Sequence, residues 1–150
     1  MEMKGEERIA AHRDAVWAAL NDPDILKQCI PGCHAITRTS PTEFSAALKV
    51  KIGPIPVMFT GQITLSNVQA PNSYTISGES AGGIAGLAKG RADVTLSEYG
   101  DETILAYDAS AEIGGRLAQL GSRLVGSSAS RLAAKFISDF SAAAAALSEA

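Results

Sequence analysis

The spacing of the hydrophobic residues changes along this chain, and that change constrains the fold more than any other feature. From residue 33 to about residue 112, apolar and polar residues alternate with a period of two, as in 44–51 and 59–66. Such alternation predicts antiparallel strands with one apolar face and one face in water. From Gly115 onward the spacing becomes three and four, which predicts one long amphipathic helix. The positions on its apolar side are Leu117, Leu120, Leu124, Ser128, Leu132, Phe136 and Phe140.

Two short helices are expected before most of the strands. Residues 5–12 predict a first strand, after which Asp14 is expected to cap a short helix. Asp22 followed by Pro23 predicts the start of a second helix, because proline at the first helical position loses no needed N–H. Pro31-Gly32 then ends that helix.

This order of elements predicts an α+β fold: a strand, two short helices, about six antiparallel strands and one long helix. Turn signals separate the later strands at 40–41, 53–54, 71–72, 82–83 and 100–101. Roughly thirty helical residues at about 1.5 Å each give a helix on the order of 45 Å long. Only the apolar face of the sheet offers enough surface to receive that helix.

The bulk composition excludes several classes of protein. A chain of 150 residues fits a single domain, 1–150. The net charge is −3 and no basic stripe is present, so a nucleic-acid binder is not expected. The sequence has no signal peptide and no apolar run of about 18 residues, so we expect a cytoplasmic protein without a transmembrane segment.

Cys29 and Cys33 stand four residues apart, and His34 follows the second directly. This spacing matches no structural zinc pattern, since such sites usually hold two spaced ligand pairs. It is also one residue longer than the usual redox motif. Cys29 lies on the apolar face of its predicted helix, where a thiol behaves as a small hydrophobe. Buried free thiols are therefore favoured over a disulfide and over a ligand or redox role.

Two loops allow more than one interpretation. GGIAGLAKG at 82–90 resembles a phosphate loop but has Ala88 before its lysine and Gly90 after it, so phosphate binding is not expected. It is either a hairpin tip or a lid, because Ile84 and Leu87 are apolar residues at a loop tip. KIGPIPVMFTG at 51–61 is either a stiff turn before a core strand or the rim of a hydrophobic cavity.

Few side chains are candidates for catalysis. His12 and His34 are the two histidines, and no nucleophile, base and acid arrangement stands out. Tyr107, Asp108 and Glu112 could act as acids or bases inside a cavity, but nothing in the pattern singles them out. An enzyme is therefore not expected.

Glycines interrupt the start of the predicted long helix. Each glycine in 114–126 is about 1 kcal/mol worse than alanine in a helix, so a close contact with the sheet, a ligand or a hinge should offset them. Arg116 and Arg123 lie seven apart and share one side of this helix. Most such arginines are only solvated, and a minority bind a partner or an anionic head group.

The order of elements resembles the helix-grip fold of the START and pollen-allergen (SRPBCC) superfamily, in which a curved sheet of about seven strands wraps around a long C-terminal helix. Within it, the residues are similar to the CoxG family, which is named for a subunit of carbon monoxide dehydrogenase. The matching segments are VWAALNDPDILKQCIPGC (16–33), VKIGPI with Phe59 and Gly61 (50–61), GGIAGLAKGRADVTL (82–96) and GGRLAQLGSRLV (114–125).

This resemblance implies a non-catalytic accessory protein for molybdenum-containing hydroxylases of the carbon monoxide dehydrogenase type. Family members are linked to membrane recruitment of the enzyme and to binding a lipophilic molecule, in particular a quinone. Some members continue into a proline-rich linker and an amphipathic tail. This sequence ends in SAAAAALSEA, which has no basic amphipathic face, so membrane attachment through a tail is not expected.

We expect an apolar cavity between the sheet and the long helix that holds a quinone or a fatty acid. The side chains expected around it are Phe59, Ile76, Val94 and Tyr107 on the sheet, Leu117, Leu120, Leu124 and Ser128 on the helix, and Ile84 and Leu87 in a lid. No metal or resident cofactor is expected. Two alternatives stay open: a docking adaptor with a filled core that uses Arg116 and Arg123, and a small cyclase or hydrolase with the same cavity.

Overall fold

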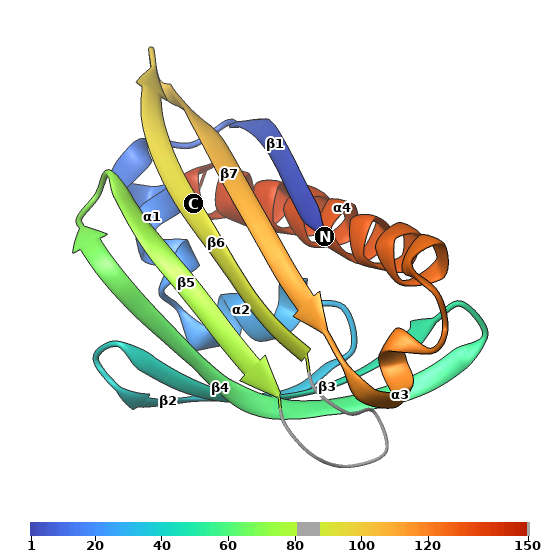
Figure 1. Cartoon of the computed structure of the whole chain (residues 1–150). Helices are drawn as coiled ribbons and strands as arrows, with labels where there is room; N and C mark the ends of the chain where they lie inside the picture. Colours follow the sequence, from blue (N-terminus) through green and yellow to red (C-terminus); the bar gives the residue numbers. More distant parts are fainter. Residues whose placement is uncertain (81–87, 150) are drawn as a thin grey trace.

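The computed structural model describes residues 1–80 and 88–149 (Figure 1). Its elements are β1 (Glu2–Ile9), α1 (Arg13–Leu20), α2 (Pro23–Cys29), β2 (Cys33–Ser40), β3 (Glu43–Ile52), β4 (Ile55–Gln69), β5 (Ser73–Ser80), β6 (Ala88–Tyr99), β7 (Glu102–Ile113), α3 (Gly115–Ala118) and α4 (Ser122–Glu149). No helix in these two ranges is both long enough and apolar enough to cross a membrane.

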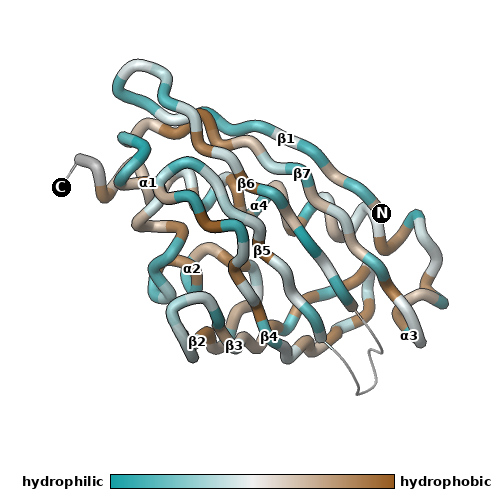
Figure 2. Tube along the Cα trace, turned by 60° about the vertical axis from the view of Figure 1, so that its left-hand side comes forward, coloured by the Kyte–Doolittle hydropathy of each residue, from teal (hydrophilic) through white to brown (hydrophobic). Residues whose placement is uncertain are grey.

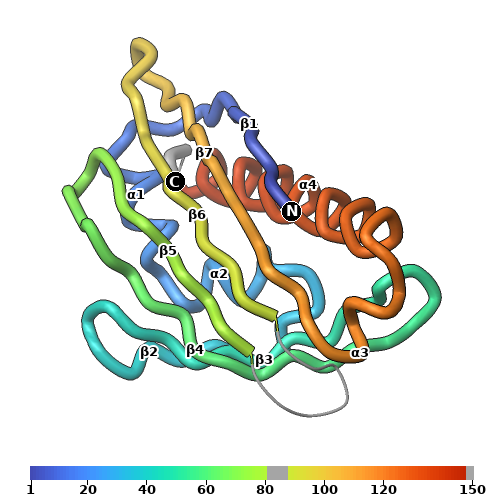
Figure 3. The backbone as a smooth tube through the Cα atoms, viewed as in Figure 1, coloured from blue at the N-terminus to red at the C-terminus, as the bar shows by residue number. Residues whose placement is uncertain are grey.

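The seven strands form one antiparallel sheet in the order β1-β7-β6-β5-β4-β3-β2. The sheet curves around α4, which lies across its concave side, while α1 and α2 fill the same side beside it (Figures 1 and 3). Hydrophilic and hydrophobic segments alternate along the strands, as the period of two requires (Figure 2). The predicted α+β helix-grip architecture is confirmed.

The start of α2 follows its sequence signals. Asp22 is the N-cap, and its Oδ1 accepts a hydrogen bond from the backbone N–H of Asp24 at 2.9 Å, with Pro23 in the first turn. The predicted cap of α1 is wrong: the N-cap is His12, whose side chain makes no capping bond, and Asp14 lies inside the first turn. There Asp14 stabilises the helix through its charge near the positive end of the dipole.

The predicted first strand, 5–12, is shifted. β1 spans Glu2–Ile9 because its pairing with β7 runs from Glu2 opposite Ser110 to Ile9 opposite Thr103. Beyond Ile9 the chain turns, with the N–H of Ala11 donating to the carbonyl of Ile9 at 2.8 Å. The pairing with β7 therefore sets the strand, and the apolar pattern of residues 9–11 belongs to a buried turn.

The long helix does not begin at Gly115 as predicted. A single turn, α3, ends at Ala118, and Gly121 then takes a φ of +95° before α4 starts at Ser122. This left-handed conformation suits glycine, which lacks a Cβ. The chain therefore changes direction at Gly121, and one of the costly glycines in this segment is explained.

The described hydrophobic residues form two clusters. The larger one joins the concave face of the sheet to α1, α2 and the C-terminal half of α4, around the fully buried Ile9, Val16 and Phe140. The smaller one lies at the other end of the sheet, where the β3–β4 hairpin packs against α3 and the first turns of α4. Its buried members are Ile52, Val57, Leu117 and Val125.

A glycine permits the close approach of β4 and β5. A Cβ on Gly61 would lie 2.1 Å from the backbone oxygen of Glu79, a distance that real Cβ atoms do not reach. Glycine in a strand often marks such a close backbone approach or a sharp bend. Gly61 therefore allows β5 to lie tightly across β4 in this part of the curved sheet.

Candidate ligand-binding cavity

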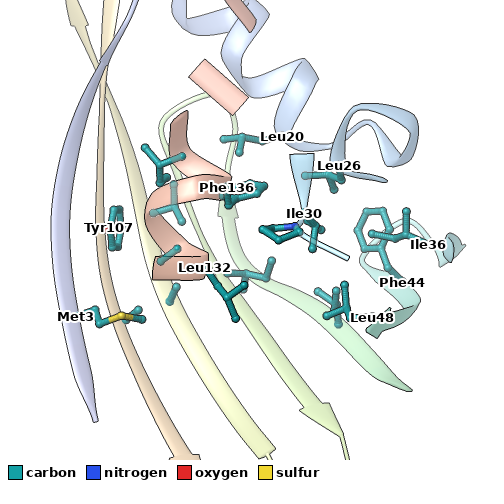
Figure 4. A pocket seen from close by; sticks show the side chains of 18 of the residues that line it. Met3, Leu20, Leu26, Ile30, Ile36, Phe44, Leu48, Tyr107, Leu132 and Phe136 are labelled. Atoms are coloured by element: carbon teal, nitrogen blue, oxygen red, sulfur yellow. The ribbon is translucent and has the colours of Figure 1, made fainter. Parts of the chain in front are cut away.

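A cavity of about 440 Å³ lies between the concave face of the sheet and α4. Small-molecule sites in proteins usually measure about 300–1,000 Å³, so this volume is in the range of a ligand site. Figure 4 shows side chains from three sides pointing into it: Tyr107 and Met3 from β7 and β1, Leu132 and Phe136 from α4, and Leu20, Leu26, Ile30, Ile36, Phe44 and Leu48 from α1 to β3.

Small side chains on the sheet leave room for this cavity. Ala92 of β6 and Ala109 of β7 both line it and stand directly opposite one another in the strand register. On the next strand, Ile76 of β5 lies opposite Ala92. All three are only half-buried although they point to the inside of the fold. The sheet thus carries two methyl groups where larger side chains would reach toward α4.

The cavity is apolar almost throughout. Among its lining side chains, Tyr74 and Tyr107 alone carry a hydroxyl, and none carries a charge. The Tyr107 ring lies over Gly5 of β1, where an added Cβ would come within 2.6 Å of Oη. Gly5 therefore lets the hydroxyl end of Tyr107 lie against the edge strand.

Tyr74 is held in the core beside the cavity. It is 6% exposed, and its ring meets that of Trp17 edge-to-face with centroids 5.3 Å apart. Burial raises the pKa of the Tyr74 hydroxyl above its ordinary value, because the anion would lose its hydration. Tyr74 is therefore neutral under physiological conditions and can offer a hydrogen bond but no charge.

The raised pKa predicts a loss of stability in alkali. Above about pH 10, the ordinary pKa of tyrosine, an unfolded chain releases the Tyr74 proton while the folded chain retains it. The contribution of Tyr74 is thus complete below that pH and is lost as the pH rises through the folded pKa. We expect urea denaturation to show a falling free energy of unfolding above about pH 10, and Tyr74→Phe to reduce this fall. Tyr99→Phe, at a 55% exposed position, is the control; an equal effect of both substitutions would contradict the assignment.

The structure brings together the four residues that the sequence proposed on the sheet. Phe59, Ile76, Val94 and Tyr107 all line the cavity. They lie on β4, β5, β6 and β7, with Tyr107 directly opposite Val94. Whether they contact a ligand remains a prediction.

The residues proposed on the helix lie elsewhere. Leu117, Leu120 and Leu124 belong to the smaller cluster at the hairpin end and are not among the lining residues. Ser128 is buried, and its hydroxyl accepts a hydrogen bond from the backbone N–H of Gly53 at 3.1 Å. The helix side of the cavity is formed one to three turns later, by Leu132, Ala133, Phe136 and Ile137.

The proposed lid and rim have different outcomes. Ile84 and Leu87 lie outside the described residues. Of the rim segment 57–59, Val57 is buried in the smaller cluster, Met58 is 52% exposed and Phe59 alone lines the cavity.

Several lining residues carry no signal that sequence reasoning used. Ile30 and Pro31 appear in the sequence only as the end of α2, yet both line the cavity. Ala92 and Ala109 alternate correctly but are too small to attract notice. The apolar residues next to Pro31-Gly32 were the one available signal, because a turn that buries them faces the interior.

The acidic candidates do not enter the cavity. Asp108 follows Tyr107 on β7 and so points to the outer face, where its Oδ2 lies 3.6 Å from Lys4 Nζ. Glu112 is exposed on the same outer face. The proposed partner residues Arg116 and Arg123 are exposed on α3 and on the first turn of α4.

Both cysteines are free thiols, Cys29 buried and Cys33 half-buried. Burial raises the pKa of both, and the nearby charges of Asp139 and Lys27 act on Cys29 and Cys33 in opposite directions. Raised pKa values keep the thiols protonated and poorly nucleophilic. Within 1–80 and 88–149, no three His, Cys, Asp or Glu side chains are grouped to hold a metal ion.

The model of the carbon monoxide dehydrogenase CoxG family matches residues 5–145. The chain belongs to the CoxG family. The resemblance drawn from residues 16–33, 50–61, 82–96 and 114–125 is thereby confirmed. No protein with a curated description matches this CoxG-family chain.

Solved structures share the fold of this CoxG member over nearly its whole length. A conserved protein from Geobacillus kaustophilus is 26% identical, with a TM-score of 0.88 over 97% of this chain and 95% of that one. Ara h 8.0201 is 10% identical, with a TM-score of 0.68 over 96% and 97%. The Zhui aromatase/cyclase from Streptomyces sp. R1128 is 14% identical, with a TM-score of 0.67 over 96% and 93%. The last two likenesses concern the fold alone.

Proposed function

We propose that this CoxG-family protein is a non-catalytic accessory protein that binds a lipophilic small molecule in its internal cavity. The observation that carries the proposal is a cavity of about 440 Å³ whose lining side chains include two hydroxyls and no charge. Water in such a space finds few hydrogen-bond partners, so an apolar ligand displaces it at little cost. Membership of the CoxG family supports an accessory role for the cavity.

A quinone or a fatty acid is the proposed ligand class. Burying about 400 Å² of an isoprenoid or acyl chain supplies a gross free energy of about 10 kcal/mol before the cost of immobilising the ligand. Tyr107 and Tyr74 are the two hydroxyls that would donate a hydrogen bond to a ligand oxygen. The polar end of the ligand is therefore proposed to lie toward β5 and β7.

The proposed partner is a molybdenum hydroxylase of the carbon monoxide dehydrogenase type in the cytoplasm. The family name, which denotes a component of carbon monoxide dehydrogenase, supports this partner. The exposed guanidinium groups of Arg116 and Arg123 are candidates for the contact, since Arg is enriched in protein interfaces. The outward placement of Asp108 and Glu112 supports a non-catalytic role over a cyclase or hydrolase, because the cavity then lacks a charged acid or base.

Native mass spectrometry of the purified protein, combined with an organic extract of the same sample, tests the proposal. We expect a co-purifying lipophilic molecule, or uptake of one equivalent of added menaquinone, ubiquinone or oleate. A clean mass of the protein alone, with no uptake of any of the three, would contradict ligand binding and favour a docking adaptor.

A further inference from the structure

One end of the molecule is purely basic and carries exposed hydrophobic side chains. This basic end consists of residues 49–58, the tip of the β3–β4 hairpin, and residues 114–131, which include α3 and the first turns of α4. It contains five of the chain's 13 Lys and Arg and none of its 16 Asp and Glu. The five are Lys49, Lys51, Arg116, Arg123 and Arg131. A chain with a net charge of −3 therefore concentrates positive charge at one place.

The two segments of the basic end are packed together. The smaller hydrophobic cluster joins Ile52 and Val57 of the hairpin to Leu117 and Val125. Two hydrogen bonds join their backbones and side chains: the Gly53 N–H donates to Ser128 Oγ at 3.1 Å, and Arg131 Nη2 donates to the Lys51 carbonyl at 3.5 Å. The five cations thus belong to one surface of fixed shape.

Hydrophobic side chains protrude from the middle of this surface. Ile55 is 39% and Met58 is 52% exposed, and Pro54 and Pro56 between them are exposed as well. In the strand register Lys49 stands opposite Met58 and Lys51 opposite Pro56, so these lysines share a face with the exposed apolar residues. None of the ion pairs within the described ranges involves the five cations. The nearest acid in the sequence, Glu112, stands opposite Lys89.

We propose that the basic end docks on the surface of an anionic lipid bilayer. Apolar side chains at a protruding tip can enter the boundary between head groups and acyl chains, while surrounding Lys and Arg interact with anionic head groups. Charge complementarity thus favours an anionic surface, and the protruding apolar tip favours a soft lipid boundary over the rigid surface of an acidic protein.

The position of the cavity adds a reason for a lipid surface. Val50 and Phe59 pack against the smaller cluster and also line the cavity, so the basic end adjoins the cavity directly. A molecule poorly soluble in water would then be exchanged where the protein meets its reservoir. This last step rests on the proposed ligand binding, whereas docking itself rests on the charges and the exposed tip.

Flotation with vesicles tests the docking. We expect the full chain to bind vesicles of phosphatidylglycerol mixed with phosphatidylcholine, to bind phosphatidylcholine vesicles weakly, and to lose binding as salt is raised. The double variant Ile55→Asp/Met58→Asp should bind at least tenfold more weakly. Val68→Asp is the matched control, because Val68 is 46% exposed at the far end of the same strand, β4.

The role of charge is tested separately. Arg116→Gln/Arg123→Gln should lower vesicle binding by roughly fivefold for each cation removed. Lys4→Gln/Arg91→Gln makes the same change in net charge away from the basic end and should leave binding unchanged. Equal binding by the two double variants, or by wild type and Ile55→Asp/Met58→Asp, would overturn the proposal. So would binding to a purified acidic protein partner without any binding to anionic vesicles.

Uptake of menaquinone in detergent, measured on the same variants, separates docking from ligand binding. Variants that lose vesicle binding but keep uptake would support docking as a distinct property. A wild-type chain that binds vesicles but takes up no ligand would refute the proposed function and leave the docking proposal supported.

Discussion

An Ala92→Phe variant is expected to fold like the wild-type protein and to take up no quinone or fatty acid. Ala92 lines the cavity on β6 and lies between Ile76 on β5 and Ala109 on β7. A phenyl ring added there points toward α4 and occupies the volume in which a ligand would lie. Because the ring enters empty space, the free energy of unfolding should stay within about 1 kcal/mol of the wild-type value, whereas a filled core would lose about 1–3 kcal/mol.

Native mass spectrometry with added menaquinone, ubiquinone or oleate measures the loss of uptake, and urea denaturation measures stability. Ala106→Phe is the matched control, because Ala106 lies on the outer face of β7 opposite Thr95. It should leave uptake unchanged. Uptake at the wild-type level by a folded Ala92→Phe variant would show that any ligand binds outside this cavity.

Phe140→Ala is expected to cost about 3–5 kcal/mol of stability, and Phe136→Ala clearly less. The two rings stack one helical turn apart on α4, with centroids 5.8 Å apart. Phe140 is fully buried in the larger cluster, so its removal leaves a new void among packed atoms. Phe136 is half-buried against an existing cavity, and its removal only enlarges a space that is already there. A small domain has a total stability of about 5–15 kcal/mol, so the first loss is a large share of it.

Urea denaturation of both variants measures this difference, provided that the slope against urea concentration stays constant. Equal losses in the two variants would mean that Phe136 packs as tightly as Phe140. The cavity would then be filled in solution.

The period of two places sheet residues on the correct face with no further information. Phe59, Ile76, Val94 and Tyr107 could be assigned to the cavity side because one face of each strand is apolar. The helix offered no such certainty, since its apolar side runs from Leu117 to Phe140. Which part of it faces the cavity depends on the turn at Gly121 and on the hairpin that packs against α3. These are contacts between segments far apart in the chain.

The cavity itself was harder to predict than its surroundings. Its volume depends on side chains that are small, such as Ala92 and Ala109, and an apolar pattern does not distinguish a filled position from an unfilled one. Ile30 and Pro31 join the cavity because the turn after α2 is bound to β3, where the N–H of Lys49 donates to the Gly32 carbonyl at 2.9 Å. That bond joins segments seventeen residues apart, and no local signal marks it.

The scarcity of polar groups in the cavity determines how such a protein would discriminate between molecules. With two hydroxyls and no charge in the lining, few directional bonds are available to separate one functional group from another. Each further methylene that is buried adds about 0.8 kcal/mol, close to a fourfold gain in affinity, until the space is full. Selectivity would then follow the length and thickness of the hydrocarbon chain, and chemically different head groups on similar chains would compete on nearly equal terms.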